Sequence, residues 1–184
     1  MIDLHLHSSA SDGKDTPAEL VARASARKVT LIALTDHDTL GGLPEFFAAA
    51  AKEGLETVSG IEISAAFLES ELHLLGYGVD VDNRPLLELL RRIRKRREAR
   101  NREIFTRMEN LGLPADYDSW RARLSTPSPG RPHIADYLID EGIVKSRREA
   151  FADYLSEGRP LYQRRDNPPL HECIAAIRAS GGLP

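Results

Sequence analysis

The sequence contains very little cysteine and few aromatic residues. Its 184 residues include a single cysteine, Cys173, which excludes a disulfide framework within the chain and a zinc site built from several cysteines. One thiol also fits a reducing compartment. Aromatic residues make up only 6% of the chain, so the hydrophobic core must consist mainly of leucine, isoleucine, valine and alanine.

Long hydrophobic runs are absent as well. No stretch approaches the roughly 18 consecutive apolar residues of a transmembrane helix, and the N-terminus has neither the basic nor the apolar region of a signal peptide. We therefore expect a cytoplasmic protein without membrane contact, and nothing in the sequence implies an obligate protein partner. The length allows one domain, or one domain with an insertion.

Positive charge is scarce in the first half of the chain. Residues 1–90 hold 6 Lys or Arg against 15 Asp or Glu, a net charge of −9, whereas residues 91–184 hold 19 against 13, a net charge of +6. An acidic half suits cations, and a basic half suits phosphates or other polyanions.

Strands and helices alternate in the first part of the sequence. The patterns predict strands at the N-terminus and over residues 30–34, 56–64 and 72–79, with helices over residues 17–27 and 39–53 between the first three. Thr16 is expected to cap the first helix with Glu19 in the capping-box position, and Thr39 to cap the second. This order predicts βαβ units in an α/β fold.

The second part of the sequence is mainly helical. We expect a long helix from about residue 85 to 111, and further helices over residues 117–124, 131–141, 147–156 and 168–180. The predicted organisation is therefore an α/β barrel portion made of residues 1–83 and 166–184. Residues 84–165 would form a basic helical insertion that covers the substrate.

The N-terminal strand carries two histidines on one face. His5 and His7 alternate with Ile2, Leu4 and Leu6, and residues two apart on a strand point to the same side. Two adjacent imidazoles on a rigid strand are suitable ligands for a divalent metal ion. Asp12 follows in a Ser-Asp-Gly turn that can bring a carboxylate back to the same site.

Further metal-ligand residue types occur near the ends of the next predicted strands. These are His37, Glu62 and His73. Sites in α/β folds form at the C-terminal ends of parallel strands. A set of nitrogen and oxygen ligands favours Zn, Mn or Fe, and six ligands exceed what one tetrahedral ion uses. Asp36 and Asp38 flank His37, where each is either a helix cap or an acceptor that orients the His37 ring.

Together these motifs resemble the polymerase and histidinol phosphatase (PHP) family. The similar segments are Asp-Leu-His-Leu-His with Ser-Asp-Gly, then Thr35–Asp38, Gly60–Glu62 and Glu71–His73, and the resemblance is greatest to the stand-alone bacterial phosphoesterases. The resemblance implies the N-terminal part of a distorted (β/α)7 barrel with an inserted helical subdomain and a trinuclear metal site.

The resemblance also implies which residues bind each ion. His5, His7 and Glu62 would hold one ion, Asp12 and His37 a second, and Glu62 with His73 a third. The family takes its remaining ligands from later strands, after a Gly-Gly-Leu-Pro-like segment such as the one at residues 181–184. We therefore expect the natural chain to continue beyond Pro184.

The predicted activity is hydrolysis of phosphomonoesters, because clustered divalent ions activate water toward phosphorus. The resemblance points to nucleotides, either a nucleoside mono- or bisphosphate or the 5′ end of a short RNA. A histidinol-phosphatase-like enzyme, a non-catalytic metal-binding PHP module and an amidohydrolase-type barrel are the alternatives. The amidohydrolase type would need a metal-bridging lysine, and the early strands contain none.

Two positions in the predicted insertion are candidates for phosphate binding. Arg131 and His133 lie in the segment Gly130–Ala135, and an arginine fork matches a phosphate. The run Arg91–Arg102 contains eight Lys or Arg residues. Without an aromatic residue to stack a base, this run is better explained as a solvated helix face than as a nucleic-acid track.

Overall fold

The computed structural model describes residues 1–68 and 70–184. The chain divides into two compact units. Unit 1 consists of Met1–Arg94, Thr126–Ser128 and Asn167–Pro184, and unit 2 of Lys95–Ser125 and Pro129–Asp166. The division falls within one long helix, and the barrel and insertion boundaries predicted from the sequence stay a prediction.

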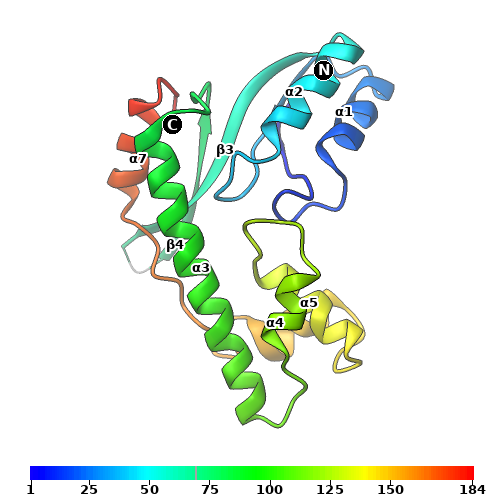
Figure 1. Ribbon diagram of the computed structural model, residues 1–184, viewed down its shortest axis with the longest axis vertical. Helices are drawn as coiled ribbons and strands as arrows, with labels where there is room; N and C mark the ends of the chain where they lie inside the picture. Colours follow the sequence, from blue (N-terminus) through cyan, green and yellow to red (C-terminus); the bar gives the residue numbers. More distant parts are fainter. Residues whose placement is uncertain (69) are drawn as a thin grey trace. The chain divides into compact units, whose positions relative to one another are not determined.

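Unit 1 is built on a four-stranded sheet with the strand order β1-β2-β3-β4 (Figure 1). The strands are β1 (Ile2–Leu6), β2 (Leu31–Leu34), β3 (Glu56–Phe67) and β4 (Ser70–Tyr77). The first three strands are parallel, as the βαβ pattern predicts, because each connection contains a helix. β4 returns from β3 as an antiparallel hairpin.

The sheet curls strongly. The hydroxyl of Tyr77 on β4 donates a hydrogen bond to the carbonyl of Leu4 on β1 at 2.9 Å, although these strands lie at opposite edges of the sheet. In a flat sheet three spacings of ~4.8 Å would separate the two edges, which exceeds the reach of a tyrosine side chain. The sheet is therefore a curled partial barrel, consistent with the expected fold class.

Helices cover the apolar face of this sheet. They are α1 (Pro17–Ala26), α2 (Leu43–Glu53), the start of α3 (Arg84–Asn110) and α7 (Leu170–Ala179). Their buried side chains join Ile32, Ile61 and Ile63 of the strands in one hydrophobic cluster. As expected from the low aromatic content, this cluster is mainly aliphatic.

Local sequence signals define α1 but not the start of α2. Thr16 and Glu19 form the predicted capping box of α1. The prediction that Thr39 caps α2 is wrong, because the helix begins at Leu43 after Gly42. The Thr39 hydroxyl instead accepts a hydrogen bond from the Gly41 amide, which makes a turn before the helix.

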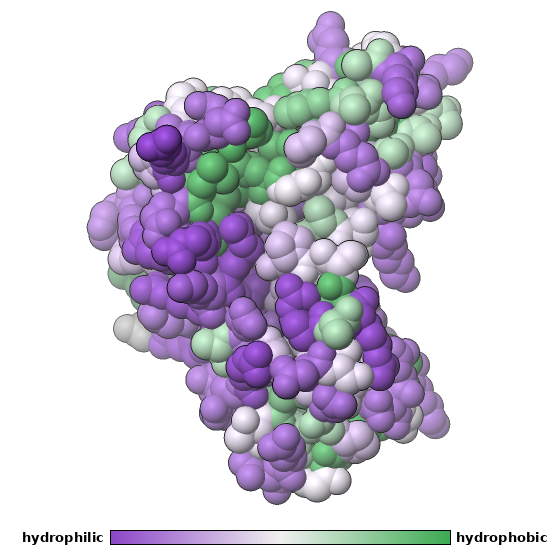
Figure 2. Space-filling view, in the orientation of Figure 1, coloured by the Kyte–Doolittle hydropathy of each residue, from purple (hydrophilic) through white to green (hydrophobic). Residues whose placement is uncertain are grey.

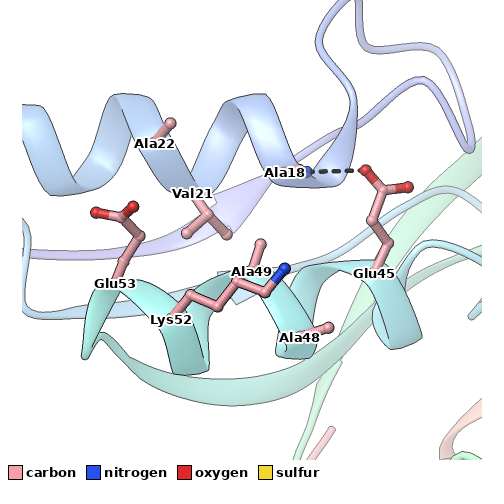
Figure 3. Close-up of a pocket in the computed structure, with 8 residues that line it drawn as sticks. All are labelled: Ala18, Val21, Ala22, Glu45, Ala48, Ala49, Lys52 and Glu53. Atoms are coloured by element: carbon pink, nitrogen blue, oxygen red, sulfur yellow. Dashed lines mark hydrogen bonds between the residues drawn. The ribbon is translucent and has the colours of Figure 1, made fainter.

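The two helices α1 and α2 pack side by side and leave a shallow groove of about 270 Å³ between them (Figure 3). Small side chains such as Ala18, Ala22 and Ala49 line the groove. The carboxylate of Glu45 on α2 accepts a hydrogen bond from the Ala18 amide at 3.2 Å. Glu45 thus satisfies a donor at the N-terminus of α1, where negative charge is favourable.

Unit 2 contains the rest of α3 with α4 (Tyr117–Ala122), α5 (Arg131–Asp140) and α6 (Arg147–Ala150). A π-helical segment, η1 (Phe151–Leu155), continues α6. Four aromatic residues, Phe105, Tyr117, Trp120 and Tyr137, pack together in its core with ring centroids 5.0–5.5 Å apart. None of the helices in the described part of the chain has the length and apolar character to cross a membrane.

The single thiol is expected to be inert in the folded protein. Cys173 is fully buried in α7, and burial raises its pKa to about 12. Because the thiolate is the reactive form, a disulfide reagent should leave Cys173 unmodified at mildly alkaline pH. The absorbance of the released thiolate reports the reaction. Reaction should become complete in urea, and rapid modification of the native protein would contradict the buried placement.

Candidate metal centre

Two histidines reach the site from β1. The pairing of β1 with β2 shifts between Asp3 and Leu6, so β1 contains one extra residue there. Such bulges commonly re-aim side chains beside functional sites. The ring centroids of His5 and His7 lie 5.1 Å apart, and both rings place Nε2 within 3.0 Å of the same oxygen of Glu62.

A tight loop after β1 brings Asp12 to the same place. The amides of Ser11 and Gly13 both donate to the Ser8 carbonyl at 3.0 Å, which turns the chain back over His7. A Cβ at Gly13 would lie 2.1 Å from the His7 carbonyl oxygen, so only glycine fits this return. Asp12 then lies 3.5 Å from His7 Nδ1 and 3.7 Å from His37 Nε2.

Glu62 lies at the centre of the cluster. Its carboxylate is 6% exposed and approaches four imidazoles. The distances are 3.0 Å to His5, 2.9 Å to His7, 3.7 Å to His37 and 2.8 Å to His73. The four rings form a continuous row, with successive centroids 5.1, 4.6 and 4.8 Å apart. A buried carboxylate is costly unless it is paired or bound to cations, and this arrangement satisfies that requirement.

The six predicted ligands form three overlapping groups. These are His5, His7 and Glu62; His7, Asp12 and His37; and His37, Glu62 and His73, with the ligand atoms of each group within 4.8 Å of one another. Among the described residues, the buried Nδ1 atoms of His7 and His37 have no hydrogen-bond partner. Unsatisfied ring nitrogens beside carboxylates are the donor set that divalent transition metals prefer.

Charges in the cluster shift the pKa values strongly. Burial alone would raise the pKa of Glu62, but hydrogen bonds from His7 and His73 outweigh it and hold that pKa far below its usual range. Hydrogen bonds to Glu62 and Glu71 raise the pKa of His73 to about 9. Burial lowers the pKa of His37 to about 4, which keeps this ring neutral and able to bind a metal at pH 7.

The PHP domain family matches residues 3–117, more than half of the chain. The chain belongs to the PHP domain family. This confirms the resemblance that the His-x-His, Thr-Asp-His-Asp and Gly-Ile-Glu segments indicate.

Named relatives of this PHP chain are phosphatases and nucleases. It is 38% identical over 183 residues to a 3′,5′-nucleoside bisphosphate phosphatase of Chromobacterium violaceum, covering 99% of the chain and 64% of that protein. It is 37% identical over 181 residues to a 5′-3′ exoribonuclease of Haemophilus influenzae, covering 98% of the chain and 66% of that protein. The chain thus spans about two thirds of the length of these relatives.

A solved structure shares the fold. The chain aligns with a TM-score of 0.92 and 33% identity to a protein of Bifidobacterium adolescentis described as a metal-dependent phosphoesterase, covering 99% of the chain and 64% of that structure. The similarity extends over both units of the PHP chain, including the helices that follow residue 117, where the family match ends.

Two of the predicted ligands lie farther from the ends of their strands than the sequence predicts. The sequence places Glu62 and His73 near strand ends, but β3 extends five residues past Glu62, to Phe67, and β4 begins three residues before His73, at Ser70. The antiparallel register places His73 opposite Ser64, two residues from Glu62, so the two side chains share one face of the hairpin. Sequence periodicity could not reveal this pairing.

The two aspartates beside His37 do not cap α2, which begins at Leu43. Asp36 is 2% exposed and accepts hydrogen bonds from the amide and hydroxyl of Ser8, at 2.7 and 2.6 Å, and from the Ser11 hydroxyl at 2.6 Å. Asp38 accepts from the amide and hydroxyl of Ser64 at 2.8 and 3.1 Å. Both carboxylates therefore fix the backbone around the cluster, and a role of Asp38 in orienting the His37 ring stays a prediction.

The phosphate-binding candidates lie in unit 2, at the start of α5. The Gly130 amide donates to His133 Nδ1 at 3.0 Å, and the Arg131 guanidinium lies 5.9 Å from the Tyr162 ring. A Cβ at Gly130 would be 2.8 Å from Arg97 Nη1, so Arg97 of α3 also lies at this helix terminus.

Two arginines of α3 are buried, which the sequence did not predict. The charge pattern favours a solvated face for the run Arg91–Arg102, but Arg97 and Arg100 are each only 5% exposed. Asn101, which is fully buried beside Arg100, donates to the Pro129 carbonyl at 3.0 Å. The only sequence signal of this buried polar contact is that an uncharged asparagine interrupts the charged run.

Proposed function

We propose that the protein is a metal-dependent phosphoesterase that hydrolyses phosphomonoesters of nucleotides. The supporting observation is the cluster of four imidazoles and two carboxylates around Glu62. The relatives named as a bisphosphate phosphatase and an exoribonuclease both act on phosphate esters of nucleotides or RNA.

The proposed cofactors are two to three divalent ions, Mn, Zn or Fe. His5, His7 and Glu62 would hold one, Asp12 and His37 a second, and Glu62 with His73 a third. Such ions activate water toward phosphorus and offset negative charge on the phosphoryl oxygens. The protein contributes a rigid ligand frame, in which Glu62 supplies the shared negative charge and the neutral His37 ring is ready to coordinate.

Arg131 and His133 remain the candidates for binding a substrate phosphate. Their support is the position at the N-terminus of α5, whose first turn contains no acidic residue. The helix dipole favours an anion there. Arg97 adds a guanidinium at the same helix terminus.

A nucleoside bisphosphate or monophosphate is favoured over a long RNA. Hydrophilic side chains cover the surface over α3 (Figure 2), but several of its arginines are already paired. Arg91 pairs with Glu88, Arg92 with Glu172, Arg96 with Asp166, and Arg102 with Glu98 and Asp118. A nucleic-acid backbone would have to displace these carboxylates, whereas a small nucleotide would not. The exoribonuclease relative keeps the 5′ end of a short RNA as the second candidate.

The test is hydrolysis by the natural protein with Mn²⁺, Zn²⁺ or Fe²⁺. The substrates are a 3′,5′-nucleoside bisphosphate, a nucleoside monophosphate, a short 5′-phosphorylated RNA and histidinol phosphate, with phosphate release as the measurement. We expect activity on the nucleotides, lost in His7→Ala and kept in His171→Ala, which removes an exposed histidine of α7. Tight metal binding without turnover of any phosphoester would refute the enzyme and favour the non-catalytic module.

A further inference from the structure

His37 is held beside β3 by the residue that follows it. The backbone at this point pairs with β3: the Glu62 amide donates to the Asp36 carbonyl at 3.3 Å, and the Asp38 amide donates to the Glu62 carbonyl at 2.9 Å. The Asp38 carboxylate forms a second contact with β3 by accepting hydrogen bonds from the amide and hydroxyl of Ser64. One buried residue thus binds the β3 backbone both at Glu62 and two residues beyond it.

The backbone of Asp38 adopts a conformation that needs support. Its φ is 55°, in the left-handed region that residues other than glycine seldom occupy. Aspartate and asparagine tolerate this region better than other residues with a side chain. A strained residue persists where the surrounding structure over-determines it, and such residues cluster at functional sites.

A contact from the start of α3 completes the support. Arg94 Nη1 donates to the Asp38 carbonyl at 3.0 Å, and burial lowers the pKa of this guanidinium. The amide and the carboxylate of Asp38 therefore form hydrogen bonds with β3, and its carbonyl accepts one from α3. Asp38 itself is fully buried and is not a member of the candidate metal groups.

We infer that Asp38 is a positioning residue that sets the separation of His37 and Glu62. The inference rests on the proposed metal centre. His37 Nδ1 lies 3.7 Å from Glu62 Oε2, and these two residues belong to a shared ligand group with His73. Asp38 is bonded directly to His37 and forms hydrogen bonds with β3 at Glu62 and Ser64. Loss of these hydrogen bonds would increase the separation of the His37, Glu62 and His73 ligand atoms and lower their affinity for a cation.

Three substitutions separate the side-chain clamp from the backbone strain. Asp38→Asn keeps a residue that tolerates positive φ and an acceptor oxygen for the Ser64 amide. Asp38→Gly removes the strain and the acceptor together, and Asp38→Ala removes the acceptor but keeps the strain. Asp82→Gly, at an exposed position of unit 1, controls for a general effect of glycine.

The first readout is Mn²⁺ binding by titration calorimetry, which requires no substrate. We expect Asp38→Gly and Asp38→Ala to bind Mn²⁺ ~10–100-fold more weakly, the usual loss when a residue supporting a metal ligand is removed. Asp38→Asn should restore affinity to within ~3-fold of the original protein. A purely structural residue would lower the unfolding midpoint in Asp38→Gly and leave Mn²⁺ affinity unchanged.

The second readout is the crystal structure of the metal-free variants. The separation of His37 Nδ1 and Glu62 Oε2 should lengthen in Asp38→Gly and stay near 3.7 Å in Asp38→Asn. Unchanged separation and unchanged Mn²⁺ affinity in Asp38→Gly would overturn the inference. A protein that binds Mn²⁺ but hydrolyses no phosphoester would refute the proposed function and leave this test intact.

Discussion

Replacement of Glu62 by glutamine is expected to lower divalent-ion affinity more than ~100-fold and to abolish phosphoester hydrolysis. Loss of a residue that merely supports a metal ligand costs 10–100-fold, and Glu62 approaches four imidazoles directly. Glutamine has nearly the same shape but no charge, so it cannot offset the charge of two cations. Calorimetric titration with Mn²⁺ and phosphate release measure the two effects.

The metal-free protein offers an independent readout of the same substitution. The pKa of His73 is about 9 because Glu62 and Glu71 accept its hydrogen bonds. Without the Glu62 charge this pKa should fall toward the ordinary histidine value, so the His73 ring loses its proton at lower pH than in the original protein. Two-dimensional NMR of the imidazole protons across a pH titration detects the change.

The matched control is Glu56→Gln, in the exposed first position of the same strand. It makes the same chemical change on β3 away from the cluster, so metal affinity and the pKa of His73 should stay as they were. If Glu62→Gln binds Mn²⁺ as tightly as the original protein does, the central carboxylate is not a ligand.

Replacement of Asp36 by alanine is expected to destabilise the protein by about 3 kcal/mol. The buried Asp36 carboxylate accepts three hydrogen bonds, from the Ser8 amide, the Ser8 hydroxyl and the Ser11 hydroxyl. Each buried donor left without an acceptor costs ~1–3 kcal/mol, and the contributions do not add fully. The free energy of unfolding in urea, followed by circular dichroism, measures the loss.

The same substitution should also impair the metal centre, because these hydrogen bonds hold the loop that carries Asp12. The loop has a second anchor in the Thr126 hydroxyl, which donates to the Ala10 carbonyl at 2.7 Å. Asp82→Ala is the control, since an exposed aspartate should cost less than ~0.5 kcal/mol. A change that small in Asp36→Ala would mean that the buried network contributes nothing to stability.

The two aspartates of the Thr-Asp-His-Asp segment thus connect the candidate ligand His37 to two neighbouring segments. Asp36 joins the end of β2 to the loop after β1, and Asp38 joins it to β3. Metal ligands that come from separate strands need such ties, because sub-ångström errors in ligand position weaken binding. Rigidity around His37 is therefore built from buried carboxylates, which in most other places would be costly.

Much of the fold could be predicted because its signals are local. The capping box of α1, the parallel order of β1, β2 and β3, and the lengths of most helices follow from short-range patterns. The start of α2 could not be predicted in this way. Thr39 has the chemistry of a helix cap, but the site around His37 takes up the residues before Leu43.

The sequence by itself determined the donor chemistry of the centre. Imidazole and carboxylate groups are properties of individual residues, so residue type and spacing alone select the six candidate ligands His5, His7, Asp12, His37, Glu62 and His73. Only the tertiary structure decided how they meet. It placed Glu62 at the centre, brought His73 from within an antiparallel hairpin, and buried Asp36, Asp38, Arg97 and Arg100. Strand register and burial depend on contacts between residues far apart in the chain, which local periodicity does not encode.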